Sequence, residues 1–232
     1  MKYLMLLLLF PTIVSAQREA GFIGDFRIFK KALTENHPAL YRFNPKEAFQ
    51  QAFDSIEQEI QKGTDEIEFF SMLSQVTTLI GEGHSHVSPS EDLMQAVYAS
   101  KLFPFEVFVK EDRLLITQSL SKEYGYLVGK EIHQINGVSV SSILKKIQRS
   151  AGLKYGFNNS AIKHVLSYSN NFAVAYFLFV GNPEVFHLES MDSNPISVYE
   201  ISASGVVHLQ AENTVFPKFP PEPIPPFTFE IL

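Results

Sequence analysis

The chain has no cysteine and no tryptophan among its 232 residues, and it has no excess of positive charge. Without cysteine there is no disulfide, no thiolate metal ligand and no cysteine nucleophile. The formal net charge is -6, and no basic stretch carries interleaved aromatic residues, which argues against a nucleic-acid partner. A hydrophobic share of 45% still provides for a sizeable core, and the length predicts one or two domains.

Long apolar runs are also scarce, and the run near the N-terminus is shorter than the roughly 20 residues that span a bilayer. Lys2 precedes a continuous apolar stretch over residues 4–10, and Val14-Ser15-Ala16 places small residues where a signal peptidase cuts. We therefore predict a signal peptide over residues 1–16 and no stable membrane span. The protein would be secreted to the periplasm or cell surface of a bacterium, a setting that suits a chain without disulfides. Retention of this segment as an N-terminal anchor is the alternative.

Three helices are predicted next, because apolar residues recur at a spacing near 3.6. The residues expected to point inward are Phe26, Phe29, Leu33, Phe49, Phe53, Ile56, Ile60, Phe69, Leu73, Val76 and Ile80. The first helix should extend from Asp25 to Asn36 and end before His37-Pro38. Asn44 is expected to cap the second helix, and Thr64 or Asp65 the third.

Beyond residue 100 the pattern alternates as in half-buried strands, at residues 103–109, 114–118 and 132–135. Asn136-Gly137 is a strong hairpin-turn signal. Ser141 or Ser142 should then cap a short helix. A second helix is predicted over residues 158–168, and a hairpin over residues 186–201. Residues 172–180 are almost entirely apolar, and periodicity leaves open whether they form a buried helix or a buried strand.

Gly81-Glu82-Gly83-His84, after the third predicted helix, is the strongest candidate for a catalytic element. A serine hydroxyl becomes a good nucleophile when a neighbouring base takes its proton, and histidine suits that task near neutral pH. Gly81 and Gly83 would allow positive φ and a close approach by another domain, so that the base is displayed on a turn. Alternatively, Gly81 is only a helix C-cap and His84 is incidental.

Three segments in this order resemble the N-terminal half of the tail-specific serine peptidases, in the branch that includes the tricorn core. They are Asn36-His37-Pro38-Ala39-Leu40-Tyr41, Gly81-Glu82-Gly83-His84, and the stretch from Gly129-Lys130-Glu131-Ile132 to Ile135-Asn136-Gly137. The resemblance extends over residues 18–203, with Glu82 in place of the more usual Asp. It implies an α+β fold: an N-terminal helical bundle over residues 17–90, then a PDZ-like, β-rich domain over residues 101–210 with a helical insertion at about residues 151–182.

The resemblance also implies an activity, the hydrolysis of a peptide or protein substrate without metal or organic cofactor. In that family the serine nucleophile lies in a further α/β domain. In the tricorn-like branch the base is a histidine placed before the PDZ-like domain, which corresponds to His84, and a glutamate of the catalytic domain completes the set. In the tail-specific branch a lysine of the catalytic domain is the base instead. Residues 214–232 are predicted to be a proline-rich linker and the start of a catalytic domain, since residues 227–232 alternate like a new strand. The rest of that domain is missing from this chain, so the chain alone is expected to be inactive.

Other interpretations of the same histidine segment stay open. His84 and His86 could bind a metal, since alternate residues of a strand share a face, although no third ligand has a recognisable spacing. Ser85 or Ser88 could pair with His84 without any further domain, although nothing resembles a nucleophile elbow. His37, at a helix end, is expected to cap carbonyl groups.

The competing functional class is a non-catalytic peptide-binding or regulatory module. A peptide would add as a strand in a groove between a strand and the helix near Ser142. Residues 151–182 are positioned to cover such a groove. The residues that would contact the peptide are not identified by the sequence.

Overall fold

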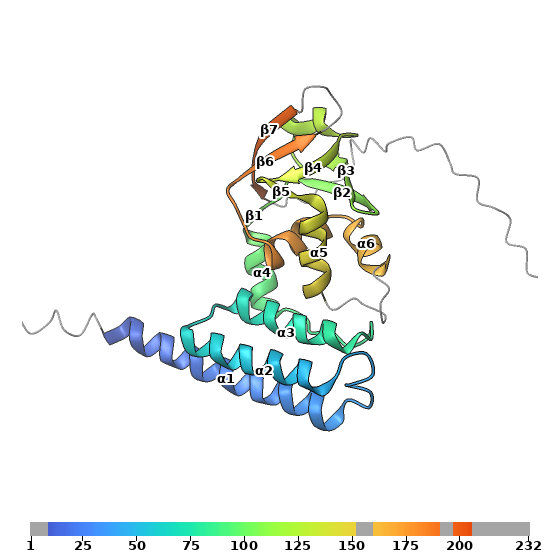
Figure 1. Ribbon diagram of the computed structural model, residues 1–232. Helices are drawn as coiled ribbons and strands as arrows, with labels where there is room; N and C mark the ends of the chain where they lie inside the picture. Colours follow the sequence, from blue (N-terminus) through green and yellow to red (C-terminus); the bar gives the residue numbers. More distant parts are fainter. Residues whose placement is uncertain (1–8, 152–159, 191–196, 206–232) are drawn as a thin grey trace, which may run out of the picture.

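The computed structural model describes residues 9–151, 160–190 and 197–205, and these form an α+β structure (Figure 1). The helices are α1 (Leu9–Asn36), α2 (Lys46–Lys62), α3 (Glu66–Ile80), α4 (Glu91–Ala99), the 3-10 helix η1 (Lys122–Leu127), α5 (Val140–Ser150), α6 (Ser160–Leu166) and α7 (Asn171–Phe179). The strands are β1 (Lys101–Leu102), β2 (Phe105–Lys110), β3 (Arg113–Ser119), β4 (Glu131–Ile135), β5 (Val138–Ser139), β6 (Val185–Ser190), β7 (Ser197–Ser202) and β8 (Ser204–Gly205). The predicted fold class, helices followed by a β-rich part, is confirmed.

Several sequence-based predictions fall on residues outside the described ranges. Half of the predicted signal peptide, residues 1–8, is outside them, whereas residues 9–16 belong to helix α1. The proline-rich segment 214–232 and the tip of the predicted hairpin at 191–196 are also outside. Within the described ranges, none of the helices combines the length and the hydropathy that crossing a bilayer requires.

The strands of the β-rich part form a six-stranded antiparallel sheet. Its order is β2-β3-β4-β6-β7, and β5 pairs with β4 beyond this path. A separate two-stranded ribbon joins β1 to β8. Figure 1 shows α1, α2 and α3 stacked at one end of the molecule and the sheet at the other, with α4 and α5 in between.

The first three helices pack through the predicted apolar stripes. The fully buried members are Phe26, Phe49, Phe53, Ile56, Ile60, Phe69, Val76 and Ile80, and the partly buried Phe29, Leu33 and Leu73 pack against the same cluster. Burying one such side chain stabilises the fold by about 1.5–3 kcal/mol. With no cysteine in the chain, packing of this kind is the main source of stability.

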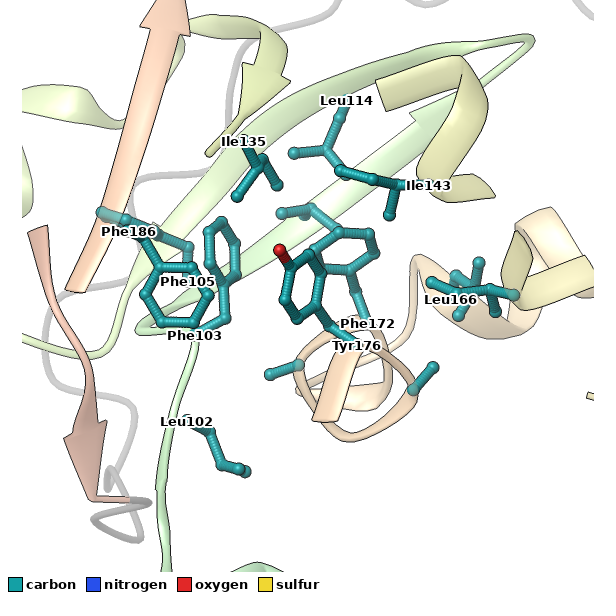
Figure 2. Close-up of a cluster of buried hydrophobic side chains, with 14 of the residues drawn as sticks. Leu102, Phe103, Phe105, Leu114, Ile135, Ile143, Leu166, Phe172, Tyr176 and Phe186 are labelled. Carbon is teal, nitrogen blue, oxygen red and sulfur yellow. The ribbon is translucent and has the colours of Figure 1, made fainter. Parts of the chain in front are cut away.

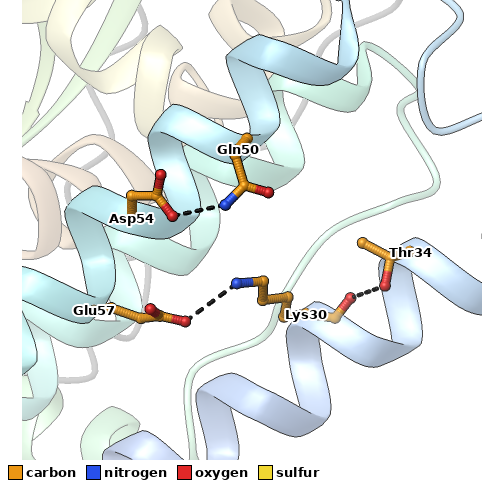
Figure 3. A network of polar contacts seen from close by, with 5 residues as sticks. All are labelled: Lys30, Thr34, Gln50, Asp54 and Glu57. Atoms are coloured by element: carbon orange, nitrogen blue, oxygen red, sulfur yellow. Dashed lines mark hydrogen bonds and ion pairs between the residues drawn. The ribbon is translucent and has the colours of Figure 1, made fainter.

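Polar contacts between α1 and α2 lie at the rim of this cluster (Figure 3). The Lys30 ammonium donates to Glu57 Oε1 at 3.1 Å and lies 5.3 Å from the centroid of the Phe53 ring. Both partners of the ion pair are substantially exposed, and exposed pairs contribute about 1 kcal/mol or less. The apolar stripe therefore determines how these helices pack, and the ion pair is a minor addition.

The helix boundaries follow the predictions with three corrections. Helix α1 begins at Leu9 and not at Asp25. Asp65 caps α3 in a complete capping box with Glu68, as expected. Asn44 does not cap α2, whose N-cap is Pro45; the Asn44 amide instead donates to the Leu79 carbonyl at 2.6 Å. Helix α5 is capped by Ser139, earlier than predicted, because strand β5 is only two residues long.

The second hydrophobic cluster fills the space between the sheet and helices α5, α6 and α7. Phe103 is packed edge-on against Phe105, Phe172 and Phe186, with ring centroids 5.1–5.3 Å apart. Figure 2 shows Phe172 and Tyr176 pointing from one helix toward these rings. Residues 172–180, left undecided by the sequence, are therefore largely helical, and helix α7 is buried because both the sheet and α5 contact it.

Helix α3 contributes to both clusters. Phe69, Val76 and Ile80 lie in the helical one, whereas Phe70 lies in the sheet-side one and stacks on Phe179 of α7 at 5.9 Å. One helix thus connects the two halves of the molecule, and its C-terminal end leads directly into the histidine segment.

Candidate functional site

Gly81 ends helix α3 and begins the candidate site. Its backbone is left-handed, with φ 69 and ψ 23, and its N–H donates to the Thr78 carbonyl at 3.2 Å. A Cβ atom here would lie 2.9 Å from Cδ2 of Phe43. The predicted C-cap is confirmed. Within the described residues, the close approach that requires glycine at this position comes from Phe43 of the helical part.

The Glu82 carboxylate organises the turn formed by Gly83 and His84. Its Oε1 accepts from the His84 main-chain N–H at 3.2 Å, and its Oε2 accepts from Ser85 Oγ at 2.8 Å. The hydrogen bond from Ser85 is the main reason why the pKa of Glu82 lies below its ordinary value. Partial desolvation raises this pKa, whereas the hydrogen bond from the His84 N–H and the nearby imidazoles of His84 and His37 lower it further. Glu82 is therefore ionised at neutral pH and holds both donors as a charged acceptor.

The His84 side chain is exposed at the surface of the molecule. It is not enclosed by the helical bundle, so another surface can reach it. The Gly81 cap fixes the main chain before His84, and Glu82 accepts the His84 N–H. After His84, the Ser85 N–H donates to the Glu82 carbonyl at 3.1 Å. The arrangement is a fixed main chain that carries an accessible imidazole, which is what a general base presented to a second surface requires.

His37 is the functional-site residue that the sequence did not identify. Its Nε2 lies 3.0 Å from Ser85 Oγ, and its Nδ1 accepts from the Ala39 N–H at 3.3 Å. The predicted role of capping carbonyl groups is wrong for this side chain, because both ring nitrogens have other partners. Nothing in the local sequence indicated the contact, since His37 and Ser85 are 48 positions apart.

The hydrogen bonds also bear on the idea that Ser85 is itself a nucleophile. In a serine triad the histidine lies between the acid and the serine and accepts the hydroxyl proton. Here the serine lies between His37 and Glu82, and its hydroxyl donates to the carboxylate. Ser85 is therefore arranged as a connecting group and not as an activated nucleophile.

The described residues do not form a metal site at His84 and His86. Both side chains are exposed. Across the ranges that the structure describes, no three His, Asp or Glu side chains gather as a metal centre would require.

A groove of about 510 Å³ opens elsewhere, between α3 and the end of α7. Its walls include Phe177 and Phe179 with the charged side chains of Glu68 and Lys146. No residue of the His84 turn lines it. The candidate base thus lies on a surface turn and not in this groove.

The predicted peptide groove near Ser142 is filled by the chain's own helices. Helix α7 contacts both α5 and β2, and so occupies the space between them. At the edge of β2, the Val109 N–H donates to Ser167 Oγ at 2.8 Å, in place of an added strand. Phe172 of α7 is part of the core cluster, so this helix is built into the fold.

The hairpin turn of the third motif is formed as predicted. Asn136 and Gly137 both have positive φ, 51 and 74, which is typical of a two-residue turn between antiparallel strands. Asn136 also pairs with His187 of β6: its N–H donates to the His187 carbonyl, and its Oδ1 accepts from the His187 N–H. Its role is to connect strands, so it contributes to the fold and not to the candidate site.

Comparison with known proteins shows a distant similarity to solved structures. No family model matches the chain, and no curated protein matches it either. Among solved structures, the chain is similar to the crystal structure of mature CPAF, with a TM-score of 0.48 and 11% sequence identity. The match covers 79% of this chain and 34% of that one. The chain thus spans about a third of the length of mature CPAF.

Proposed function

We propose that this chain is the base-bearing N-terminal part of a serine peptidase of the tail-specific, tricorn-like kind. His84 is the general base, and the serine nucleophile and the rest of the active site come from a further domain beyond the linker at residues 214–232. The protein is exported through the signal peptide at residues 1–16. The substrate is a peptide or protein, and no metal or organic cofactor takes part.

One observation supports the proposal most strongly, namely an exposed imidazole on a main chain that is fixed at both sides. Before His84, Gly81 is left-handed and packed against Phe43, and Glu82 accepts the His84 N–H. After His84, the Ser85 N–H donates to the Glu82 carbonyl at 3.1 Å. A histidine that merely followed a helix cap would need neither the carboxylate nor the link to His37. The order of the three sequence segments, with the hairpin at Asn136-Gly137 formed, is the second support.

The alternative, a peptide-binding module, has less support. Its groove is occupied by α7, and an outward N–H of strand β2 is bonded to Ser167. Strand addition at β2 would require α6 and α7 to leave the core, in which Leu166 and Phe172 are buried.

The test is peptide hydrolysis by the protein produced from its whole reading frame. We expect His84→Ala to lower kcat/KM by about 10²–10⁴-fold, the usual contribution of a positioned base. His86→Ala is the matched control, because His86 is exposed two positions further on, and it should keep its rate. Equal rates for the wild-type protein and the His84→Ala variant, both folded by circular dichroism, would reject His84 as the base.

A further inference from the structure

His37 is joined to the His84 turn by a continuous series of hydrogen bonds. The first hydrogen bond joins His37 Nε2 and Ser85 Oγ at 3.0 Å, and the second joins Ser85 Oγ and Glu82 Oε2 at 2.8 Å. The third joins Glu82 Oε1 and the His84 N–H at 3.2 Å. The series begins just beyond the end of α1 and finishes at the main chain of the candidate base. It therefore connects two segments that the sequence holds far apart.

The direction of each hydrogen bond follows from its partners. An ionised carboxylate can only accept hydrogen bonds, so the single hydroxyl proton of Ser85 is donated to Glu82. Ser85 Oγ must then accept from His37, which requires a proton on Nε2. The other ring nitrogen agrees, because Nδ1 accepts the Ala39 N–H and so is unprotonated. The neutral Nε2–H tautomer of His37 satisfies every contact at once.

We propose that His37 is a positioning residue for the His84 turn. It donates to Ser85, orients the hydroxyl of Ser85 toward Glu82, and thereby holds the carboxylate that receives the His84 N–H. This inference rests on the proposed function, since a turn held in this way matters most when His84 must meet a reacting hydroxyl. His37 acts through Ser85 and Glu82 and does not itself touch the reacting groups.

A purely structural role for His37 explains less of the geometry. Packing in this region is supplied by Leu40, which is buried, whereas the His37 side chain is only partly buried. A hydroxyl and a carboxylate at the surface could each hydrogen-bond to water as readily as to one another. Their alignment in one series, ending on the main chain of His84, is what a positioning role requires.

The first experiment measures the His37 tautomer and the amide exchange of His84, and it does not require catalytic activity. In the ¹⁵N-labelled chain, long-range ¹H–¹⁵N spectra should show His37 as the Nε2–H tautomer. Amide exchange at His84 should rise on the order of fivefold in His37→Ala and by tenfold or more in Ser85→Ala, because the second change removes a bond to a charged group. Ser88→Ala is the matched serine control and should leave exchange at His84 unchanged.

The second experiment measures turnover in the protein from its whole reading frame. His37→Ala should lower kcat by about ten- to hundredfold with KM unchanged, because the base is displaced and substrate binding is not. His37→Gln should restore most of the rate, since its amide nitrogen can donate from the position of Nε2. The double variant His37→Ala, Ser85→Ala should lose little more than Ser85→Ala alone, as expected for residues in one series.

The outcomes separate this inference from the proposed function. Unchanged exchange at His84 in His37→Ala, or a dominant Nδ1–H tautomer, overturns the positioning role whatever the activity is. Equal kcat for wild type and His37→Ala in an active peptidase overturns it too. If the exchange results hold and the full protein hydrolyses no peptide, the positioning of the turn is supported and the proposed function fails.

Discussion

Gly81 meets two constraints at once, and each of them excludes a side chain. Its φ of 69 is in the left-handed region, and a Cβ atom would come within 2.9 Å of Phe43. Gly129 has a similar φ of 88 with no atom near its missing Cβ. The two glycines therefore share a positive φ and differ in what surrounds the missing Cβ, which makes Gly129 a suitable control for Gly81.

We expect Gly81→Ala to lower the free energy of unfolding by about 1–3 kcal/mol through backbone strain, with a further loss from the contact with Phe43. Gly129→Ala should show the strain alone. Urea unfolding of the two variants, followed by circular dichroism, measures the difference. A Gly81→Ala midpoint equal to or above that of Gly129→Ala would contradict this account of the turn.

At the residue scale, the sequence predicted interactions between neighbours in the chain, such as helix caps, and missed contacts between residues far apart in the chain. The cap at Gly81 and the capping box at Asp65 follow from residue type and neighbours, and both are present. The contact between His37 and Ser85 depends on how α1 and α3 end against one another. No periodic pattern or motif predicts a contact of this kind, so the hydrogen bonds that join His37 to the His84 turn were identified only from the structure.

At the scale of elements, amphipathic helices were predicted well because their spacing is a direct physical signal. Every predicted inward residue of α2, for example Phe49 and Ile60, is buried. Helix α7 could not be predicted in the same way, since a segment that is apolar all round has no period. Helix α4 was not predicted, although Ser90 caps it by accepting the Leu93 N–H.

Helix α3 offers a test at this scale because it contributes to two clusters. We expect Phe70→Ala to lower the free energy of unfolding by about 3–5 kcal/mol, since it removes a buried ring stacked on Phe179. Gln75→Ala, an exposed change on the same helix, should stay within about 0.5 kcal/mol of wild type. Urea denaturation checks both variants.

A small effect of Phe70→Ala, comparable to that of Gln75→Ala, would mean that the ring contributes little to the core beside α7. Two unfolding transitions in the Phe70→Ala variant, where the wild type has one, would instead indicate that the helical and sheet parts are coupled through this contact. The predicted division at residues 17–90 and 101–210 would then describe two cooperative units.

At the scale of the whole molecule, the two clusters leave the His84 turn at the surface beside the end of α3. The sheet part supplies no open peptide groove at β2, because α6 and α7 are built into it. In the proposed peptidase these elements support the fold, and catalysis depends on the position of His84 relative to the serine nucleophile. The α+β class and the helical part were predictable from the sequence, whereas the filling of the groove depended on the tertiary position of α7.

Covalent labelling by a fluorophosphonate probe shows whether an activated serine is present and where it lies, and so tests whether His84 serves a serine outside residues 1–232. In the protein from the whole reading frame, we predict a single labelled serine outside residues 1–232, and a labelling rate that falls by at least about a hundredfold in His84→Ala but not in His86→Ala. A labelled serine within residues 1–232, such as Ser85, or a labelling rate unchanged by His84→Ala, would contradict the account.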